Sequence, residues 1–279
     1  MIYKSIYLLG QKLRNPSINR QLKFLKETEN WTLEQLESYQ LKKLKEVVDF
    51  AFNNSKYYNQ KMLEKGILPS NINSIKDIKQ LPILTKRDLL KYNLEIQSSF
   101  KFKKTFKAVT SGSSGNSLMF YRDEYADSFN RAASIRGYSW YGVKPWERNA
   151  YFWGYNFNRL KRLVTFFLDL IQNRFRTFNY NDDSLSKFVR KAKKAKYIHG
   201  YSSMIYEVAK LINQRNLPQL ENIKMVKGTS EKIFESYQQE ITKAFGIKMI
   251  SEYGATESGI IAFECPEGNM HINMEGVIV

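Results

Sequence analysis

Three short clusters of small, hydroxylated and acidic residues have the types and spacing to do chemistry. They are TSGSSG at 110–115, GTSEKI at 228–233 and SEYGATES at 251–258. In the first cluster, Gly112 and Gly115 allow backbone amides to turn toward one point. Hydroxyl groups surround that point with further hydrogen-bond donors, from Thr110, Ser111, Ser113 and Ser114. The cluster suits a bound phosphate, and taken alone it equally suits a solvated hairpin loop.

The first cluster is not a Walker loop. It lacks the lysine of the G-x-x-x-x-G-K-[ST] pattern, and it leads into LMFYR, whose composition is typical of a strand rather than a helix. A phosphate bound here would therefore be held by amides and hydroxyls.

The pattern of apolar residues indicates which elements position these clusters. Residues 33–51 have leucines, valines and an alanine at helical spacing, and Thr85 followed by Asp88 predicts a capped short helix. Short strands are predicted at 149–154, 176–180, 197–201, 222–228 and 247–254, with helical segments between them. This alternation predicts an α/β fold with a mostly parallel, helix-flanked sheet and a helical N-terminal cap. The three clusters then fall at strand ends, where open sheets usually bind ligands.

Four motifs, in this order, resemble those of one family. TSGSSGNSLMF, HGYSSMI, VKGTSEKIFESY and SEYGATESGIIAFECPEGNMH are similar to the motifs of the adenylate-forming (acyl-CoA synthetase-like) ligases, and within them of the phenylacetate-CoA ligase and CapK-like branch. The resemblance runs from about Leu81 to the last residue. Helical periodicity predicts a helical region over 1–80, and the resemblance implies that 81–279 form the nucleotide-binding domain of such enzymes, incomplete at its C-terminus.

The resemblance implies a reaction and its cofactors. Such enzymes activate a small carboxylic acid with ATP and magnesium, give an acyl-adenylate, and usually pass the acyl group to CoA or another thiol. Glu257 stands where the family binds magnesium, and a hard oxygen ligand is what Mg²⁺ prefers. Thr256 would bond the α-phosphate, and Tyr253 would lie against the adenine. Nucleotide contacts are further expected from the first cluster and from Gly228, Ser230, Glu231 and Gly254.

The acyl pocket is expected near Trp153, Tyr155, Tyr201, Gly254 and Ala255, and its aromatic residues favour an apolar or ring-bearing acid. The same aromatic residues also suit a protein core. The chain departs from the family in the phosphate loop, where Ser114 replaces the usual Thr and Asn116-Ser117 stands where a Pro commonly follows. Ser114 keeps the hydroxyl, so the departure concerns loop stiffness.

Cys265 and His271 offer an alternative role as two ligands of a structural zinc, because some relatives carry zinc near this position. Tetrahedral zinc needs four ligands, and no further cysteine exists in the chain to complete the set. His199 is better interpreted as a strand residue beside the pocket.

Charge and cysteine content restrict the partners and the compartment. The chain of 279 residues carries a formal net charge of +17, yet its densest basic run, SLSKFVRKAKKAK, has the apolar stripe of an ordinary solvated helix. A nucleic-acid surface is the less favoured reading of that run. No apolar run approaches the ~20 residues of a membrane span, and a single cysteine predicts a reducing, cytoplasmic location.

The sequence stops at EGVIV, within an expected strand and before the family's ribose-binding Asp and C-terminal Lys. This predicts a truncated or split gene with impaired turnover. A homodimer and a separately encoded C-terminal domain are the protein partners consistent with that prediction. A non-catalytic nucleotide-binding remnant, or a CapK-like protein of capsular polysaccharide biosynthesis, is the alternative function.

Overall fold

The computed structural model describes residues 2–110, 117–152, 159–177 and 181–279. The chain forms two compact units, and each is described by itself. Unit 1 comprises Met1–Pro16, Ala133–Ala255 and Ile260–Ile272. Unit 2 comprises Ser17–Ala132, Thr256–Gly259 and Asn273–Val279.

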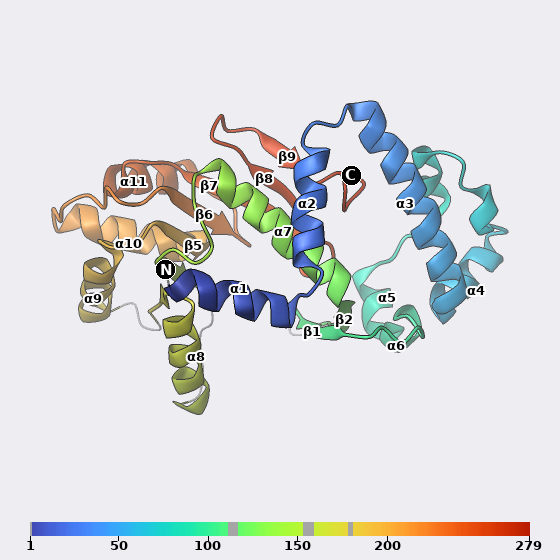
Figure 1. Cartoon of the computed structure of the whole chain (residues 1–279), viewed down its shortest axis with the longest axis horizontal. Helices are drawn as coiled ribbons and strands as arrows, with labels where there is room; N and C mark the ends of the chain where they lie inside the picture. The colour runs from blue at the N-terminus through green and yellow to red at the C-terminus, as the bar shows by residue number, and fades with distance from the viewer. Residues whose placement is uncertain (1, 111–116, 153–158, 178–180) are drawn as a thin grey trace. The chain divides into compact units, whose positions relative to one another are not determined.

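Unit 1 is built on a sheet with the strand order β4-β3-β5-β6-β7-β8-β9 in the described residues (Figure 1). The pairs from β4 through β7 are parallel, and β8 and β9 pair antiparallel. The strands are β3 (Asn149–Phe152), β4 (Arg174–Phe175), β5 (Tyr197–Tyr201), β6 (Met225–Thr229), β7 (Met249–Ala255), β8 (Gly259–Glu264) and β9 (Met270–Ile272). The predicted mostly parallel α/β sheet is therefore confirmed.

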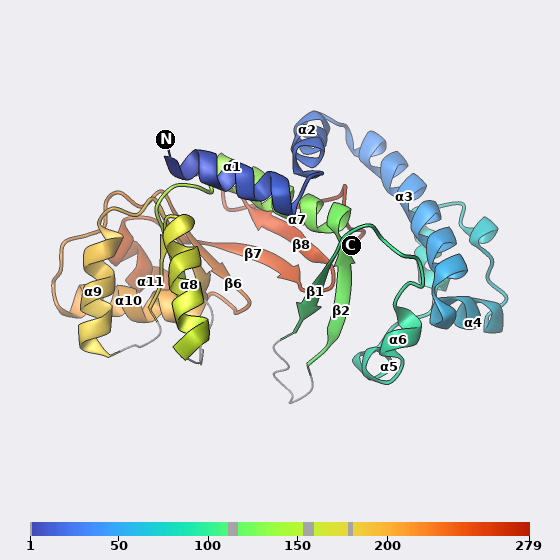
Figure 2. The same ribbon diagram turned by 60° about the horizontal axis from the view of Figure 1, so that its bottom comes forward.

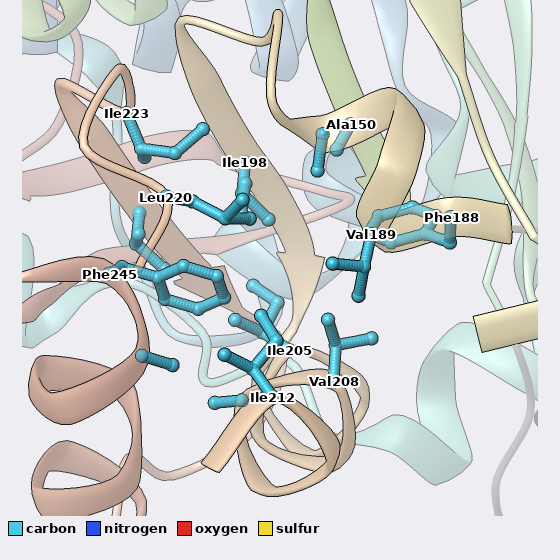
Figure 3. Close-up of a cluster of buried hydrophobic side chains, with 14 of the residues drawn as sticks. Ala150, Phe188, Val189, Ile198, Ile205, Val208, Ile212, Leu220, Ile223 and Phe245 are labelled. Atoms are coloured by element: carbon cyan, nitrogen blue, oxygen red, sulfur yellow. The ribbon is translucent and has the colours of Figure 1, made fainter. Parts of the chain in front are cut away.

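Three helices bury the apolar core of unit 1 against one face of this sheet (Figure 3). They are α9 (Asp182–Ala192), α10 (Ser202–Gln214) and α11 (Glu235–Phe245). The predicted apolar stripe of α9 is confirmed, because the side chains at its helical spacing are buried: Leu185, Phe188, Val189, Ala192 and, just beyond the helix, Ala195. Ile198, Val226 and Met249 supply the strand side of the core.

The opposite face of the sheet carries a second cluster with aromatic and polar members. Tyr197, Met225 and Ile250 point to this face, where they meet Phe263 of β8 and Tyr138 near the end of α7 (Glu124–Trp140). The alternation of Tyr197 with Ile198, and of Met225 with Val226, follows the two-residue period of a strand.

Gly200 interrupts the alternation at the end of β5. Its φ is +138°, and a Cβ at this position would lie 2.2 Å from the backbone oxygen of Phe152 on β3. Only glycine tolerates both the backbone angle and the contact. Beyond it, Tyr201 is partly buried and packs against the apolar core cluster.

Two further helices of unit 1, α1 (Ile2–Arg14) and α8 (Arg159–Ile171), contact each other. No helix among the described residues has the length and apolar character to cross a membrane.

Unit 2 is mainly helical and carries one antiparallel hairpin, β1 (Thr105–Val109) with β2 (Met119–Asp123), in its described part. Its apolar cluster includes Leu44, Val48 and Met62. Besides the first part of α7, its helices are α2 (Ile18–Thr28), α3 (Leu33–Asn54), α4 (Lys56–Glu64), α5 (Lys86–Lys91), α6 (Asn93–Ile96) and the 3₁₀ turns η1 (Pro69–Asn71) and η2 (Ile75–Gln80).

Two local expectations for unit 2 are confirmed. The Thr85–Asp88 cap of α5 is present, since the Thr85 side chain accepts from the Asp88 amide and the Asp88 carboxylate accepts from the Thr85 amide. The helix expected over 33–51 is α3, in which Leu44 and Val48 are buried while Leu33 and Val47 are exposed.

The strand predicted at 176–180 is displaced. The structure places β4 at Arg174–Phe175, residues 176–177 are irregular, and 178–180 lie outside the described residues. The physical reason is a side-chain contact: the Arg176 guanidinium donates two hydrogen bonds of 2.5 and 2.6 Å to the buried Asp169 of α8. This pair ties the segment after β4 to α8 instead of extending the edge strand.

Candidate nucleotide-binding cleft

A cleft of about 650 Å³ opens in unit 1 beside the carboxyl ends of β6 and β7. Its walls come from the loop after β6, the first turns of α11 and the end of β7. Four residues predicted to contact a nucleotide line this cleft together: Ser230, Glu231, Tyr253 and Gly254. They are far apart in sequence, and the parallel pairing of β6 with β7 brings their strand ends to one edge.

The loop after β6 is held by its own backbone angle and by a helix. Ser230 has a φ of +67°, which turns the chain sharply away from the strand. The Glu231 carboxylate accepts a hydrogen bond of 2.8 Å from the amide of Ser203, in the first turn of α10. The N-cap residue of α10, Tyr201, makes no side-chain cap, so Glu231 supplies the anionic group that a helix N-terminus favours.

Gly228 serves close packing in this structure. A Cβ at Gly228 would lie 2.4 Å from the Oγ of Ser202 and 3.0 Å from the Sδ of Met249. The start of α10 can approach β6 this closely only because no side chain intervenes. Gly228 is not among the residues that line the cleft, so its predicted nucleotide contact stays a prediction.

The open side of the cleft presents the ring of Tyr253. Its side chain is 60% exposed at the end of β7, next to Gly254, which has no side chain. A flat, accessible ring beside a glycine is a surface on which a planar base can stack.

Behind this surface, the cleft is stiffened by hydrogen bonds between elements. The Gln238 side chain of α11 donates to the Met249 carbonyl at 2.7 Å and accepts from the Met249 amide at 2.9 Å. The Ser251 amide donates to the Glu264 carboxylate at 2.7 Å, which joins β7 to β8. These contacts fix the strand that carries Tyr253.

One residue of the cleft wall, Glu252, belongs to a buried ion pair. Lys227 Nζ of β6 donates to Glu252 Oε2 of β7 at 2.5 Å, and the lysine side chain lies over the ring of Tyr138, 5.2 Å from its centroid. The side chains are only 6% and 12% exposed. Sequence reasoning missed this pair, although a lysine and a glutamate inside two predicted strands were a signal for it.

The row of buried polar groups continues along the same sheet face. Asn149 Oδ1 accepts from Arg174 Nε at 3.1 Å and lies 3.2 Å from His199 Nε2. Burial, with the cations Arg174, Lys227 and Arg176 around it, lowers the pKa of His199 well below its ordinary value. His199 is therefore neutral at pH 7, and it is a buried strand residue that does not line the cleft.

The charge of the cleft favours one part of a nucleotide. Four carboxylates line it, from Glu231, Glu235, Glu252 and Glu264, with Lys232 as the lysine among the lining residues. The charge of Glu252 is compensated by Lys227, so three carboxylates outweigh one lysine. Carboxylates accept hydrogen bonds from amino and hydroxyl groups but repel phosphate oxygens, and this lining suits a base and a sugar better than a triphosphate.

The remaining predicted residues lie in other parts of the chain. In unit 2, Thr110 closes the β1–β2 hairpin, since its amide donates to the Leu118 carbonyl at 2.9 Å and its hydroxyl accepts from the Leu118 amide at 2.8 Å. Ser111, Gly112, Ser113, Ser114 and Gly115 lie outside the described residues. Thr256 is half-buried and Glu257 is exposed, both in unit 2. A meeting of these groups with the cleft stays a prediction.

The predicted acyl-pocket residues are not gathered by the described structure. Trp153 and Tyr155 lie outside the described residues, and Ala255 is exposed at the end of β7. Tyr201 packs against the apolar core of unit 1.

Cys265 and His271 both belong to the β8–β9 hairpin, in which His271 pairs with Phe263. Cys265 is a buried free thiol, and His271 packs its ring against Trp140 with 5.3 Å between centroids. Among the residues that the structure describes, no group of three or more His, Cys, Asp and Glu could hold a metal ion. The role of Cys265 and His271 as zinc ligands stays a prediction.

We compared the sequence and the fold of this chain with those of known proteins. No family model matches the chain. Protein CapK of Staphylococcus aureus is 23% identical over 254 residues, covering 84% of this chain and 53% of CapK. The chain thus spans about half the length of this curated relative.

Solved structures of 2-hydroxyisobutyryl-CoA ligase have the same fold. The structure in the postadenylation state with 2-HIB-AMP matches with a TM-score of 0.67 at 16% identity, over 85% of this chain and 53% of that one. The open conformation with 2-HIB-AMP and CoA matches with a TM-score of 0.64 at 16% identity, over 82% and 52%. The predicted resemblance in fold to the large N-terminal domain of adenylate-forming enzymes is confirmed, and the match to CapK agrees with the predicted branch.

Proposed function

We propose that this chain binds ATP and takes part in the activation of a small carboxylic acid, first as an acyl-adenylate and then as a thioester of CoA or another thiol. The observation that carries the proposal is the cleft that gathers Ser230, Glu231, Tyr253 and Gly254, in a fold shared with an acyl-CoA ligase. Such ligases bind an acyl-adenylate and CoA in their solved structures.

In this proposal the cleft holds the adenosine part of ATP. Adenine stacks on the exposed ring of Tyr253, and the carboxylates at the rim accept hydrogen bonds from the amino group and the ribose hydroxyls. Base stacking on an aromatic side chain contributes roughly 1 to 3 kcal/mol. The cleft supplies selectivity for the nucleoside but little attraction for the phosphates.

The phosphates then require the loop at 110–115 and the segment Thr256–Glu257. Glu257 suits magnesium, because its carboxylate is exposed and, among the described residues, has no ion-pair partner. Magnesium bound there would neutralise charge between the phosphates. Thr110 and Thr256 would position the α-phosphate by hydrogen bonds from their hydroxyls.

The chemistry proposed is two successive displacements. An oxygen of the substrate carboxylate forms a bond to the α-phosphorus, and the bond from that phosphorus to pyrophosphate breaks. The sulfur of the acceptor thiolate then bonds the acyl carbon, and AMP leaves. The acid is proposed to be apolar or ring-bearing, and the single, buried cysteine agrees with a cytoplasmic setting.

A nucleotide-binding protein without turnover is the second candidate, favoured by the sequence match to CapK rather than to a named ligase. ATP–pyrophosphate exchange in the presence of aromatic and aliphatic acids separates the two candidates. Exchange above the level without acid supports activation, and ATP binding without exchange supports the second candidate.

Calorimetry with adenosine and with MgATP tests the site itself. Tyr253→Ala should weaken both ligands by about tenfold or more, since both lose the stacked ring. Tyr125→Ala is the matched control, because this tyrosine of α7 has a similar exposed fraction, 49% against 60%, and does not line the cleft. Equal affinity in the wild-type chain and in Tyr253→Ala would contradict the proposed site.

A further inference from the structure

Helix α8 has its apolar side turned toward solvent. Its buried residue is Asp169, 5% exposed, and the half-buried Thr165 lies one turn earlier on the same side. The apolar side chains of the helix are between 49% and 78% exposed: Leu160, Leu163, Val164, Phe166, Phe167, Leu168, Leu170 and Ile171. A surface helix of a globular protein normally has the opposite arrangement. In Figure 1, α8 extends below the labelled strands of unit 1, and Figure 2 shows it beside α9 and α10.

The polar side of α8 explains its attachment. Asp169 receives the two hydrogen bonds from Arg176 and holds the helix to the segment after β4. The apolar residues on the outward side are therefore not part of the hydrophobic core, although apolar residues of a helix normally are. Eight apolar residues on one exposed helix are far more than the isolated surface leucines of ordinary proteins, and such a patch marks an interaction surface.

Helix α1, which contacts α8, repeats the pattern on a smaller scale. Tyr3, Tyr7 and Gln11 form its half-buried side. Ile2, Ile6, Leu9 and Leu13 fall on a separate stripe and are 69%, 37%, 61% and 70% exposed.

A cationic pocket of about 610 Å³ adjoins both helices. Tyr3 of α1 and Asn173, two residues beyond the end of α8, form part of its wall. The rest is basic: Arg148, Lys187, Arg190, Lys191 and Lys194. Among the described residues no carboxylate lines this pocket, and Arg190, Lys191 and Lys194 have no ion-pair partner.

Charge decides which occupant fits these surfaces. Helix α1 contains no acidic residue, and the one carboxylate of α8, Asp169, is buried in its pair with Arg176. With a net charge of +17, two copies would repel one another across such a surface. An apolar helix side next to a hollow lined by cations matches a layer whose interior is apolar and whose surface is anionic.

We propose that the chain docks peripherally on an anionic phospholipid bilayer, with the apolar sides of α8 and α1 inserted among the acyl chains and the cationic pocket holding a lipid phosphate. The helices lie in the interface and do not span the bilayer. This docking is independent of the nucleotide cleft.

Co-sedimentation with vesicles tests the docking. The purified chain should bind vesicles that contain phosphatidylglycerol and phosphatidylcholine, and should bind pure phosphatidylcholine vesicles about tenfold less or weaker still. Added salt should weaken the first interaction, because it screens charge. Equal binding to both vesicle types, or no binding to either, would overturn the proposal.

Two pairs of variants assign the effect to residues. F166S/F167S removes two rings that are more than half exposed and should reduce vesicle binding by about tenfold or more without loss of the folded state. I83S/L94S is its control, because Ile83 and Leu94 are 84% and 82% exposed in unit 2. K191E/K194E should reduce binding to the anionic vesicles alone by a similar factor. K42E/K45E, on the exposed surface of α3, changes the net charge equally and should bind nearly as well as wild type.

Folding of each variant is checked by its denaturation midpoint. If a folded F166S/F167S variant bound vesicles as tightly as the wild-type chain does, the insertion of α8 would be contradicted. A wild-type dimer that F166S/F167S converts to a monomer, measured by light scattering, would show that a second copy covers this helix and would also overturn the proposal.

Discussion

The ammonium of Lys227 and the carboxylate of Glu252 join β6 to β7 through a 2.5 Å hydrogen bond that is almost fully shielded from water. Glu252 also lines the cleft, and Lys227 lies on the neighbouring strand. Because the two buried charges compensate each other, the position of Glu252 in the cleft wall depends on Lys227.

Replacing one member of this pair should lower the free energy of unfolding. Lys227→Ala leaves the Glu252 carboxylate buried without its cation, and the free energy of unfolding should fall by about 3 to 5 kcal/mol. Urea denaturation measures the loss. K227M/E252L, which removes both charges at similar volume, should recover most of it. Lys61→Ala is the control, because its pair with Glu64 is exposed and its loss should leave the free energy of unfolding nearly unchanged. A double variant as unstable as the single one would contradict this account.

Neutral, buried His199 should make stability depend on pH. Its pKa is lowered in the folded chain, so below the ordinary value of about 6.5 the unfolded chain binds a proton that the folded chain does not. This contribution to stability is present above pH 6.5 and is lost as the pH falls, by at most about 1.4 kcal/mol per pH unit.

The two histidines of the chain allow a clean comparison. Urea denaturation at several pH values between 5 and 8 should give a shallower dependence for His199→Gln than for wild type, since glutamine keeps a donor for Asn149 but does not titrate. His271→Gln, at an exposed position, should keep the wild-type dependence. Parallel curves for His199→Gln and wild type would show that folding does not lower the pKa of His199.

The close approach of β6 to α10 predicts a specific rescue. Gly228→Ala should destabilise the chain by roughly 1 to 3 kcal/mol, because the new methyl group overlaps the Oγ of Ser202. That oxygen is buried and has no hydrogen-bond partner among the described residues, so S202A/G228A should regain much of the loss. Thermal unfolding of the single and double variants measures the coupling. If the double variant lost as much stability as the two single variants together, the strain would have to arise elsewhere.

Magnesium dependence tests the proposed role of Glu257. Calorimetry of the wild-type chain should show ATP binding that strengthens when magnesium is added. In Glu257→Gln this gain should fall by about tenfold or more, while adenosine affinity should stay unchanged because the cleft is untouched. The exposed Glu34 offers a control as Glu34→Gln. A full magnesium effect in Glu257→Gln would assign the ion to another ligand.

Much of the fold could be predicted because its signals are local. The stripe of Leu185, Phe188 and Val189 predicts both the helix and its buried side, and the order of strands and helices predicts a parallel sheet. The exposure of Leu33 shows the limit of such patterns. Periodicity gives a helix an apolar side, but tertiary packing decides which side is buried, as the outward side of α8 also shows.

The residues that line the candidate site could be predicted from the sequence in part, and the long-range contacts that hold them could not. Ser230 and Tyr253 belong to short motifs at strand ends, so the sequence points to them directly. The Lys227–Glu252 pair and the bond from Glu231 to Ser203 join residues that are 25 and 28 positions apart. Such contacts exist only once β5, β6 and β7 are aligned, and a local pattern does not contain that register.

Gly200 gives a practical rule for interpreting other sequences with this fold. At this glycine the backbone has a φ that residues with a side chain rarely adopt, and the Cβ of any other residue would overlap the carbonyl oxygen of Phe152 on the neighbouring strand. The strand nevertheless continues to Tyr201, which pairs with Thr229 of β6 and touches the apolar core cluster. Any sequence aligned here that carries a side chain at position 200 must have a different end to β5, and residues after that point should not be transferred from one chain to the other.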